Sequence, residues 1–184
     1  MKLSKPVQWT LFAVALLAVG YAGIRAGIAL RGRTTPVTAA GPRLPFQPGD
    51  SLPDVQLADS SGAAVHSRDL IVGSGTIVLF LDPTCKGCLA MSQRWEQAIK
   101  DGVVTADRVI GISRDGAEAN QRFRTQHGLQ FPIYQDVKSA YLQQHAVTTY
   151  PLEIVVGTSG IIQSISEDSK GEMDADRLRS LMIR

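Results

Sequence analysis

The segment TIVLFLDPTCKGC, residues 76–88, joins an apolar run to two cysteines separated by two residues. Its first six residues are β-branched, aliphatic or aromatic, which is typical of a buried strand. Apolar side chains then recur at close to helical spacing through residues 86–100, and Asp101 and Gly102 supply a stop signal. A strand that delivers a Cys-x-x-Cys to the start of a helix is the outline of a thiol-disulfide exchange site.

Strand and helix patterns alternate along the rest of the chain, which predicts the α/β class. A central mixed sheet flanked by helices, with an antiparallel hairpin at one edge, is the expected architecture. Extended segments are predicted at 51–57, near Val65, and at 76–81, 108–112, 131–134, 152–156 and 161–165. Helices are predicted at 86–100, 117–127, 139–145 and 173–183.

The N-terminal part of the chain differs in composition from the rest. Residues 7–24 carry no charge, and as a helix they nearly cross a bilayer core. We interpret residues 1–30 as a membrane anchor or export signal, with an uncleaved single-pass anchor favoured. Residues 31–48 are rich in proline and predict a semi-extended linker. Residues 49–184 are then the folded domain.

The charge distribution argues against nucleic acid as a partner. Residues 1–33 hold five basic residues and no acid, which leaves 14 basic and 17 acidic residues in the other 151, a net charge of −3. Nucleic-acid-binding faces are normally basic. Both cysteines of the chain lie in the motif, so there are no stray thiols, which suits an oxidising compartment.

The two cysteines have different expected roles. At a helix N-terminus, Cys85 lies where unpaired backbone N–H groups and the helix dipole favour the thiolate, and Lys86 adds a cation for electrostatic tuning. Cys85 is therefore the expected nucleophile. Cys88, one turn later, is the expected resolving cysteine that breaks the mixed disulfide. The redox-active pair itself then serves as the only cofactor.

Other uses of a Cys-x-x-Cys are disfavoured by position. A c-type haem site needs His after the second cysteine, where this chain has Leu89. A zinc site needs further ligands, but the three histidines are scattered, so no metal site is expected. A copper-delivery domain would have a wider cysteine spacing and a suitably placed His. A peroxidatic cysteine needs Thr or Ser three residues earlier and Pro seven earlier, where this chain has Asp82 and Val78.

Several motifs, in matching order and spacing, closely resemble the membrane-anchored thioredoxin-like proteins of the TlpA/ResA type. They are GDSLPD (49–54), VLFLDPTCKGC (78–88), FPIYQD (131–136), TYP (149–151) and GTSG (157–160). The Pro-Thr-Cys-x-x-Cys variant looks most like the disulfide carriers used in maturing methylamine dehydrogenase. The resemblance implies a thioredoxin fold on the periplasmic side of a bacterial inner membrane.

The same resemblance implies a cis proline opposite the dithiol, which Pro151 matches. A cis peptide there would expose the backbone of Thr149 and Tyr150 to an incoming peptide by strand addition. An ordinary trans proline that opens a strand is the alternative. The chain departs from the family at Thr84, where an aromatic residue is usual, and at Gly87, where a proline is usual.

The acids that related proteins carry near the dithiol are missing, because their positions hold Leu79 and Met91. Asp82 and Glu153 are the candidates for a substitute proton relay to Cys88. In the alternative interpretation Asp82 caps the turn, and Glu153 either points to solvent or pairs with a Lys or Arg.

These patterns predict a membrane-tethered, extracytoplasmic protein thiol-disulfide oxidoreductase. Its expected partners are protein thiols or disulfides and a membrane redox protein, in cytochrome c or periplasmic enzyme maturation. Two alternatives remain open at this stage. One is a peroxide-reducing enzyme on the same fold, and the other is a non-catalytic assembly or metal chaperone.

Overall fold

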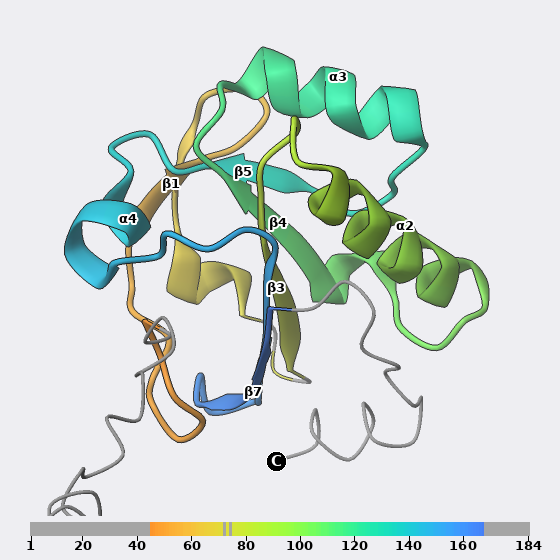
Figure 1. Ribbon diagram of the computed structural model, residues 1–184. Helices are drawn as coiled ribbons and strands as arrows, with labels where there is room; N and C mark the ends of the chain where they lie inside the picture. Colours follow the sequence, from red (N-terminus) through yellow and green to blue (C-terminus); the bar gives the residue numbers. More distant parts are fainter. Residues whose placement is uncertain (1–44, 72, 74, 168–184) are drawn as a thin grey trace, which may run out of the picture. The chain divides into compact units, whose positions relative to one another are not determined.

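A computed structural model describes residues 45–71, 73 and 75–167, and in this part the chain forms a sheet flanked by helices (Figure 1). The expected α/β class is confirmed. The elements are β1 (Gln56–Ala58), β2 (Ala64–His66), the 3-10 helix η1 (Ser67–Leu70), β3 (Thr76–Leu81), α2 (Lys86–Lys100), the 3-10 helix η2 (Ala106–Arg108), β4 (Val109–Ser113), α3 (Ala117–His127), β5 (Ile133–Gln135), α4 (Ala140–His145), β6 (Leu152–Val156) and β7 (Ile162–Ser166).

The described strands form one mixed sheet in the order β2-β1-β5-β4-β3-β6-β7. β3, β4 and β5 run parallel, and helices α2 and α3 supply the crossovers that parallel neighbours require. β6 pairs antiparallel with β3, and β7 pairs antiparallel with β6. The predicted hairpin at one edge of the sheet is therefore present.

Strand β3 lies inside the sheet and is buried along its whole length. Its side chains alternate between two cores, because successive residues of a strand point to opposite faces. Ile77, Leu79 and Leu81 pack with residues of α2 and α3. Val78 and Phe80 pack on the other face, where the Tyr141 ring of α4 lies 4.9 Å from that of Phe80. Figure 1 shows α2 and α3 together on one side and α4 on the other.

Four of the predicted elements agree most closely with the structure. The bounds of β3, α2, α3 and β6 match the predicted ranges, and α3 ends at Gly128, whose φ of 63° is the left-handed conformation that glycine adopts easily. The first extended segment is shorter than predicted. It begins at Gln56, and Ser51 forms only an isolated bridge with Ile161.

Ordered packing begins a few residues before the predicted domain start. Phe46 falls in the predicted linker but is buried, and its ring lies edge-on to that of Tyr141 at 6.5 Å between centroids. Gly49 also donates its N–H to the carbonyl of Ile162 at 2.8 Å. The end of the proline-rich segment therefore contributes to the core.

The predicted anchor at 1–30, most of the linker and the predicted helix at 173–183 lie outside the described residues. Within the described ranges, no helix has both the length and the apolar character needed to cross a membrane.

Gly111 of β4 marks a close approach between neighbouring strands. A Cβ at this position would lie 2.9 Å from Cγ1 of Ile133 and 3.0 Å from Cδ1 of Leu81. We expect Gly111→Ala to lower the free energy of unfolding by about 1–3 kcal/mol, the usual effect of overpacking a core. Urea denaturation would measure it. Gly73→Ala is the control, because nothing lies within 4 Å of a Cβ there, and an equal loss in both variants would contradict the explanation.

Candidate active site

The turn between β3 and α2 positions the first cysteine. Oδ1 of Asp82 accepts hydrogen bonds from the backbone N–H of Thr84 at 2.8 Å and from its hydroxyl at 2.7 Å. The N–H of Cys85 donates to the Asp82 carbonyl at 3.0 Å. Asp82 therefore caps the turn, as in the alternative interpretation of the sequence. The hydroxyl and N–H of Thr84 lower the pKa of Asp82, which makes its carboxylate a weaker proton acceptor.

Cys85 is the N-cap of α2, as the sequence predicted. Its Sγ accepts the N–H of Cys88 at 3.1 Å, so the sulfur lies against the free N–H groups of the first helical turn. The thiol also lies 3.9 Å from the Tyr150 carbonyl, to which it donates. Cys85 is half-buried, and its sulfur lies at the meeting point of the helix start and the loop before β6.

Cys88 has a very different environment one turn further on. It is fully buried, and its Sγ accepts the N–H of Asp82 at 3.4 Å. Burial raises the pKa of Cys88 to about 12, and the hydrogen bond with Cys85 acts in the same direction. Cys88 thus stays a thiol at neutral pH, which fits a resolving role and leaves Cys85 as the accessible sulfur. Both cysteines are free.

The loop opposite the dithiol contains the expected cis peptide, between Tyr150 and Pro151. The ring of Pro151 packs against the first turn of α2. A Cβ at Gly87 would lie 3.1 Å from Cδ of Pro151 and 3.8 Å from Sγ of Cys85. The absence of a side chain at Gly87 therefore lets the loop and the helix approach closely.

Glu153 lies on the same side of the sheet as the dithiol but at a distance from it. It is the cross-strand partner of Leu79, and its side chain is only 2% exposed. Oε2 accepts the indole N–H of Trp95 at 2.9 Å and forms an ion pair with Arg94. Trp95 lies about 10 Å along the helix from Cys88, given a rise of about 1.5 Å per residue.

This arrangement decides between the interpretations of Glu153. The Glu153 side chain does not point to solvent. It pairs with Arg94, as one of the alternative interpretations of the sequence predicted. Burial raises the pKa of Glu153, while the charge of Arg94 and the hydrogen bond from Trp95 oppose that shift. The contacts attach β6 to α2, and they involve neither cysteine.

The structure brings most of the predicted site residues together, and it adds one that the sequence analysis missed. Arg114 follows the last residue of β4, and its guanidinium carbon lies 5.2 Å from the centroid of the Tyr150 ring. One feature of the sequence could have indicated Arg114: it follows a predicted parallel strand, and ligand sites on such sheets form at the carboxyl ends of the strands. The residues that meet here are Asp82, Cys85, Cys88, Tyr150 and Pro151, with Thr149 half-exposed in the loop and Lys86 exposed beside the first cysteine.

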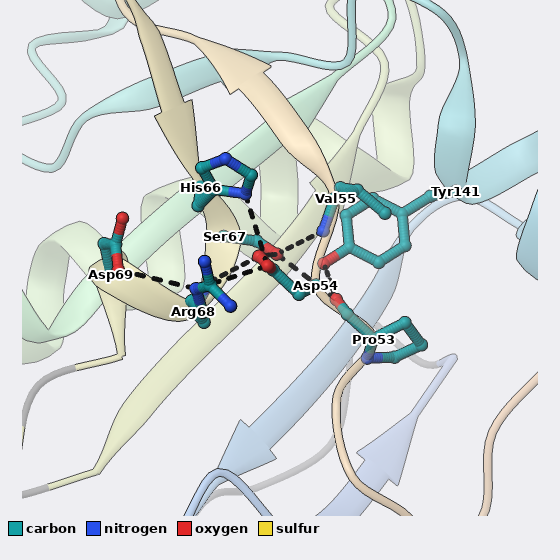
Figure 2. Close-up of polar contacts among 8 residues, drawn as sticks. All are labelled: Pro53, Asp54, Val55, His66, Ser67, Arg68, Asp69 and Tyr141. Atoms are coloured by element: carbon teal, nitrogen blue, oxygen red, sulfur yellow. Dashed lines mark hydrogen bonds and ion pairs between the residues drawn. The ribbon is translucent and has the colours of Figure 1, made fainter.

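A second polar cluster lies around Asp54 (Figure 2). Asp54 contacts Nδ1 of His66 at 3.2 Å and Nε of Arg68 at 3.3 Å. Ser67 next to them is buried, and its hydroxyl accepts the N–H of Val55 and donates to the Pro53 carbonyl. A serine so placed is not an accessible nucleophile, so the cluster fixes the loop before β1 rather than forming a Ser-His-Asp site. The described residues also contain no group of three or more His, Cys, Asp or Glu side chains able to hold a metal ion.

The raised pKa of Cys88 can be tested in the Cys85→Ser variant, in which it is the only thiol. A pKa raised from 9.0 to about 12 lowers the thiolate fraction at neutral pH by about a thousandfold, and burial, the largest cause of the rise, remains in this variant although the contribution of Cys85 is lost. We expect iodoacetamide to alkylate the folded variant at least about a hundredfold more slowly than the same variant in urea. Folded Cys88→Ser is the control and should react readily. If Cys85→Ser were alkylated equally fast when folded and in urea, the raised pKa of Cys88 would be refuted.

Glu153 is expected to give a measurable pH dependence of stability. Because its pKa is raised on folding, the folded state binds the proton more tightly than the unfolded chain. This contribution is complete below the ordinary pKa of 4.5 and is lost as the pH rises through the folded-state value. The free energy of unfolding of the wild type, relative to Glu153→Gln, should therefore increase on acidification, by about 1.4 kcal/mol for each unit by which the pKa is raised.

Urea denaturation of the two proteins at a series of pH values would measure this difference. The glutamine of the variant keeps the shape of the side chain but does not titrate. A difference that shrinks as the pH falls toward 4.5 would mean that pairing with Arg94 outweighs burial.

Solved structures of redox proteins share this fold at low sequence identity. Peroxidoxin BcpB from Mycobacterium tuberculosis has a TM-score of 0.60 and 20% identity, covering 76% of this chain and 99% of that chain. The thioredoxin domain of a thiol-disulfide oxidoreductase from Bacteroides vulgatus has a TM-score of 0.57 and 18% identity, with coverages of 73% and 94%. A secreted M. tuberculosis disulfide oxidoreductase homologous to E. coli DsbE has a TM-score of 0.53 and 21% identity, with coverages of 69% and 92%.

At these identities the likeness shows the fold, which is thioredoxin-like. A search of curated proteins found no match. The family comparison is more direct, because residues 48–165, well over half of the chain, match the AhpC/TSA family of redox proteins. The chain therefore belongs to the AhpC/TSA family.

Proposed function

We propose that the domain is a protein thiol-disulfide oxidoreductase in which Cys85 attacks and Cys88 resolves. The observation that supports this most directly is the place of the Cys85 sulfur, between the start of α2 and the Tyr150 carbonyl that precedes cis-Pro151. A peptide that adds as a strand along Thr149 and Tyr150 would bring its own sulfur to this point.

The bonds, protons and electrons of the exchange balance without a cofactor. The Cys85 thiolate attacks one sulfur of a substrate disulfide, a new S–S bond forms, and the other substrate sulfur leaves as a thiolate that takes up a proton. Cys88 then loses its proton and attacks the sulfur of Cys85, which releases the second substrate thiol. The substrate gains two electrons and the domain becomes the Cys85–Cys88 disulfide. Run in reverse, the same steps oxidise a substrate dithiol.

The burial of Cys88 suits this order of events. Its thiol is protonated and inaccessible while Cys85 is free, so it does not compete for the substrate. When Cys85 enters a mixed disulfide, its sulfur carries no charge, and ionisation of Cys88 is then less strongly opposed. The charge of the Asp82 carboxylate acts on Cys88 and the Asp82 N–H binds its Sγ, but the lowered pKa of Asp82 and its bonds to Thr84 favour a structural role over proton transfer.

The proposal includes a setting for the reaction. The uncharged segment at 7–24 and the absence of thiols outside the motif support a membrane-tethered protein of the TlpA/ResA type, with its domain on the periplasmic side of a bacterial inner membrane. A membrane redox protein would exchange electrons with the dithiol, and the substrates would belong to cytochrome c or periplasmic enzyme maturation. The reduction potential sets the direction, at about 1.4 kcal/mol for each 30 mV.

Peroxide reduction is the second candidate, and membership of the AhpC/TSA family together with the likeness to a peroxidoxin favours it. Two local features oppose it. The positions where a peroxidatic site has Thr or Ser and Pro hold Asp82 and Val78. The Asp82 carboxylate is also already engaged by Thr84.

Insulin reduction by dithiothreitol would test the proposed exchange. We expect the wild-type chain to accelerate it and Cys85→Ser to return the rate to the uncatalysed value, because no accessible nucleophile is left. Cys88→Ser should keep the attacking sulfur but accumulate a mixed disulfide visible on a non-reducing gel.

The same samples separate the rival functions. Hydrogen peroxide consumption that depends on Cys85, without insulin reduction, would replace the proposal with the peroxidase. A protein that reduces neither substrate but retains a stoichiometric metal after purification would favour the non-catalytic carrier.

A further inference from the structure

Arg114 lies beside the proposed substrate-binding loop. Its guanidinium carbon is 5.2 Å from the centroid of the Tyr150 ring, a distance at which a cation is attracted to an aromatic face. The carbonyl of Tyr150 is the group that accepts the Cys85 thiol. Burial raises the pKa of Tyr150, and the positive charge of Arg114 opposes that shift, which also indicates that the two side chains are close. Arg114 is thus connected to the reactive sulfur through one residue.

The backbone around Arg114 is held in place by partly buried hydrogen bonds. Ser113 is the last residue of β4, and its hydroxyl accepts the N–H of Asp115 at 3.0 Å. The side-chain amide of buried Asn120 donates to the Asp115 carbonyl at 3.0 Å. The loop is therefore fixed at both ends, and Arg114 is presented from a defined position.

The charge of Arg114 is available to a ligand. The side chain is exposed, and within residues 45–71, 73 and 75–167 it forms no ion pair. The nearby carboxylates are otherwise engaged, since Asp82 binds Thr84 and Asp115 lies 3.3 Å from the Ser113 hydroxyl. Only long-range attraction links Arg114 to Asp82, and it contributes to the lowered pKa of that acid.

A second exposed cation follows the nucleophile directly. Lys86 is the first residue of α2, and Arg114 lies by the loop that faces Cys85. Both positive charges belong to a chain whose residues after 33 have a net charge of −3. Lys86 and Arg114 thus place two exposed cations beside the dithiol, next to the hydrogen-bonded carboxylates of Asp82 and Asp115.

We propose that Arg114 is a specificity-determining residue that, with Lys86, selects protein substrates whose reactive cysteine is flanked by acidic side chains. The inference rests on the proposed exchange function and names its substrate class. A guanidinium beside the added strand would bind the carboxylate of a flanking Asp or Glu, in the paired geometry that arginine favours. A lysine at the same place in the substrate would be repelled.

The expected effect is moderate, because both charges remain partly in water. Exposed ion pairs usually change an equilibrium or a rate by only a fewfold. We expect a preference of about three- to tenfold for an acidic over a basic flank at low ionic strength. The preference should shrink as salt rises, since the Debye length falls from about 30 Å at 0.01 M to about 3 Å at 1 M.

The test uses the purified, reduced full chain in neutral detergent and three pentapeptides. Each peptide carries a central Cys activated as a 2-thiopyridyl disulfide, flanked on both sides by Asp, Asn or Lys. Attack by Cys85 releases pyridine-2-thione, which is followed by absorbance. Each rate is divided by that of the same peptide with dithiothreitol, which removes the intrinsic effect of the flanking charges on the disulfide.

Variants at Arg114, with a control variant at another exposed arginine, show which residue causes the preference for acidic peptides. Arg114→Gln should bring the Asp and Lys peptides to within about twofold of each other, and Arg114→Lys should keep part of the preference because it keeps the charge. Arg122→Gln removes the same charge from an exposed position on α3, where Arg122 pairs with Glu118, and should leave the preference unchanged.

The outcomes separate the inference from the function on which it rests. Equal rates with all three peptides in the wild type, or a preference that survives in Arg114→Gln, would overturn the specificity role while leaving exchange established. Rates no higher than those of Cys85→Ser with any peptide would overturn the exchange function and the specificity role together.

Discussion

The antiparallel pairing of β3 with β6 is the interaction on which the candidate site depends. In its register Phe80 lies opposite Leu152, so β3 leaves the sheet toward Cys85 where β6 enters it from Pro151. Residues about 65 positions apart therefore meet at one edge of the sheet, and the Cys85 thiol reaches the Tyr150 carbonyl. A slip of one residue would move every β6 side chain to the opposite face and separate the loop from the dithiol.

Within this frame, the first turn of α2 gives two identical thiols different chemistry. Cys85, as the N-cap, is partly exposed and receives a backbone N–H, whereas Cys88 faces the core between β3 and the helix. Burial disfavours the charged form of the inner sulfur, since a thiolate in an apolar environment loses its hydration. Gly87 between them keeps the helix close enough to Pro151 for the loop to cover the site. Both the proposed attacking role and the proposed resolving role thus depend on one turn of helix.

The order of the long elements could be predicted because their signals are local. An unbroken apolar run defined β3, helical spacing with a stop signal defined α2, and Gly128 defined the end of α3. Shorter elements depend more on contacts with distant parts of the chain. The bounds of β1 depend on its pairing with β2 and β5, and Phe46 is buried in a core cluster that includes Tyr141 of α4. A short window of sequence does not indicate such contacts, because the partners lie far apart in the chain.

The sequence by itself determined the features on which the proposed chemistry rests: a dithiol at the start of a helix and a proline matched to it. Only the tertiary structure decided the roles of the charged residues. Asp82 caps its own turn, Glu153 pairs with Arg94 and Trp95, and Arg114 lies over Tyr150. A strand or helix signal is carried by neighbours in the chain, whereas the partner of a charged side chain is set by the register of the sheet and the packing of helices on it. The sequence alone specifies neither of these locally.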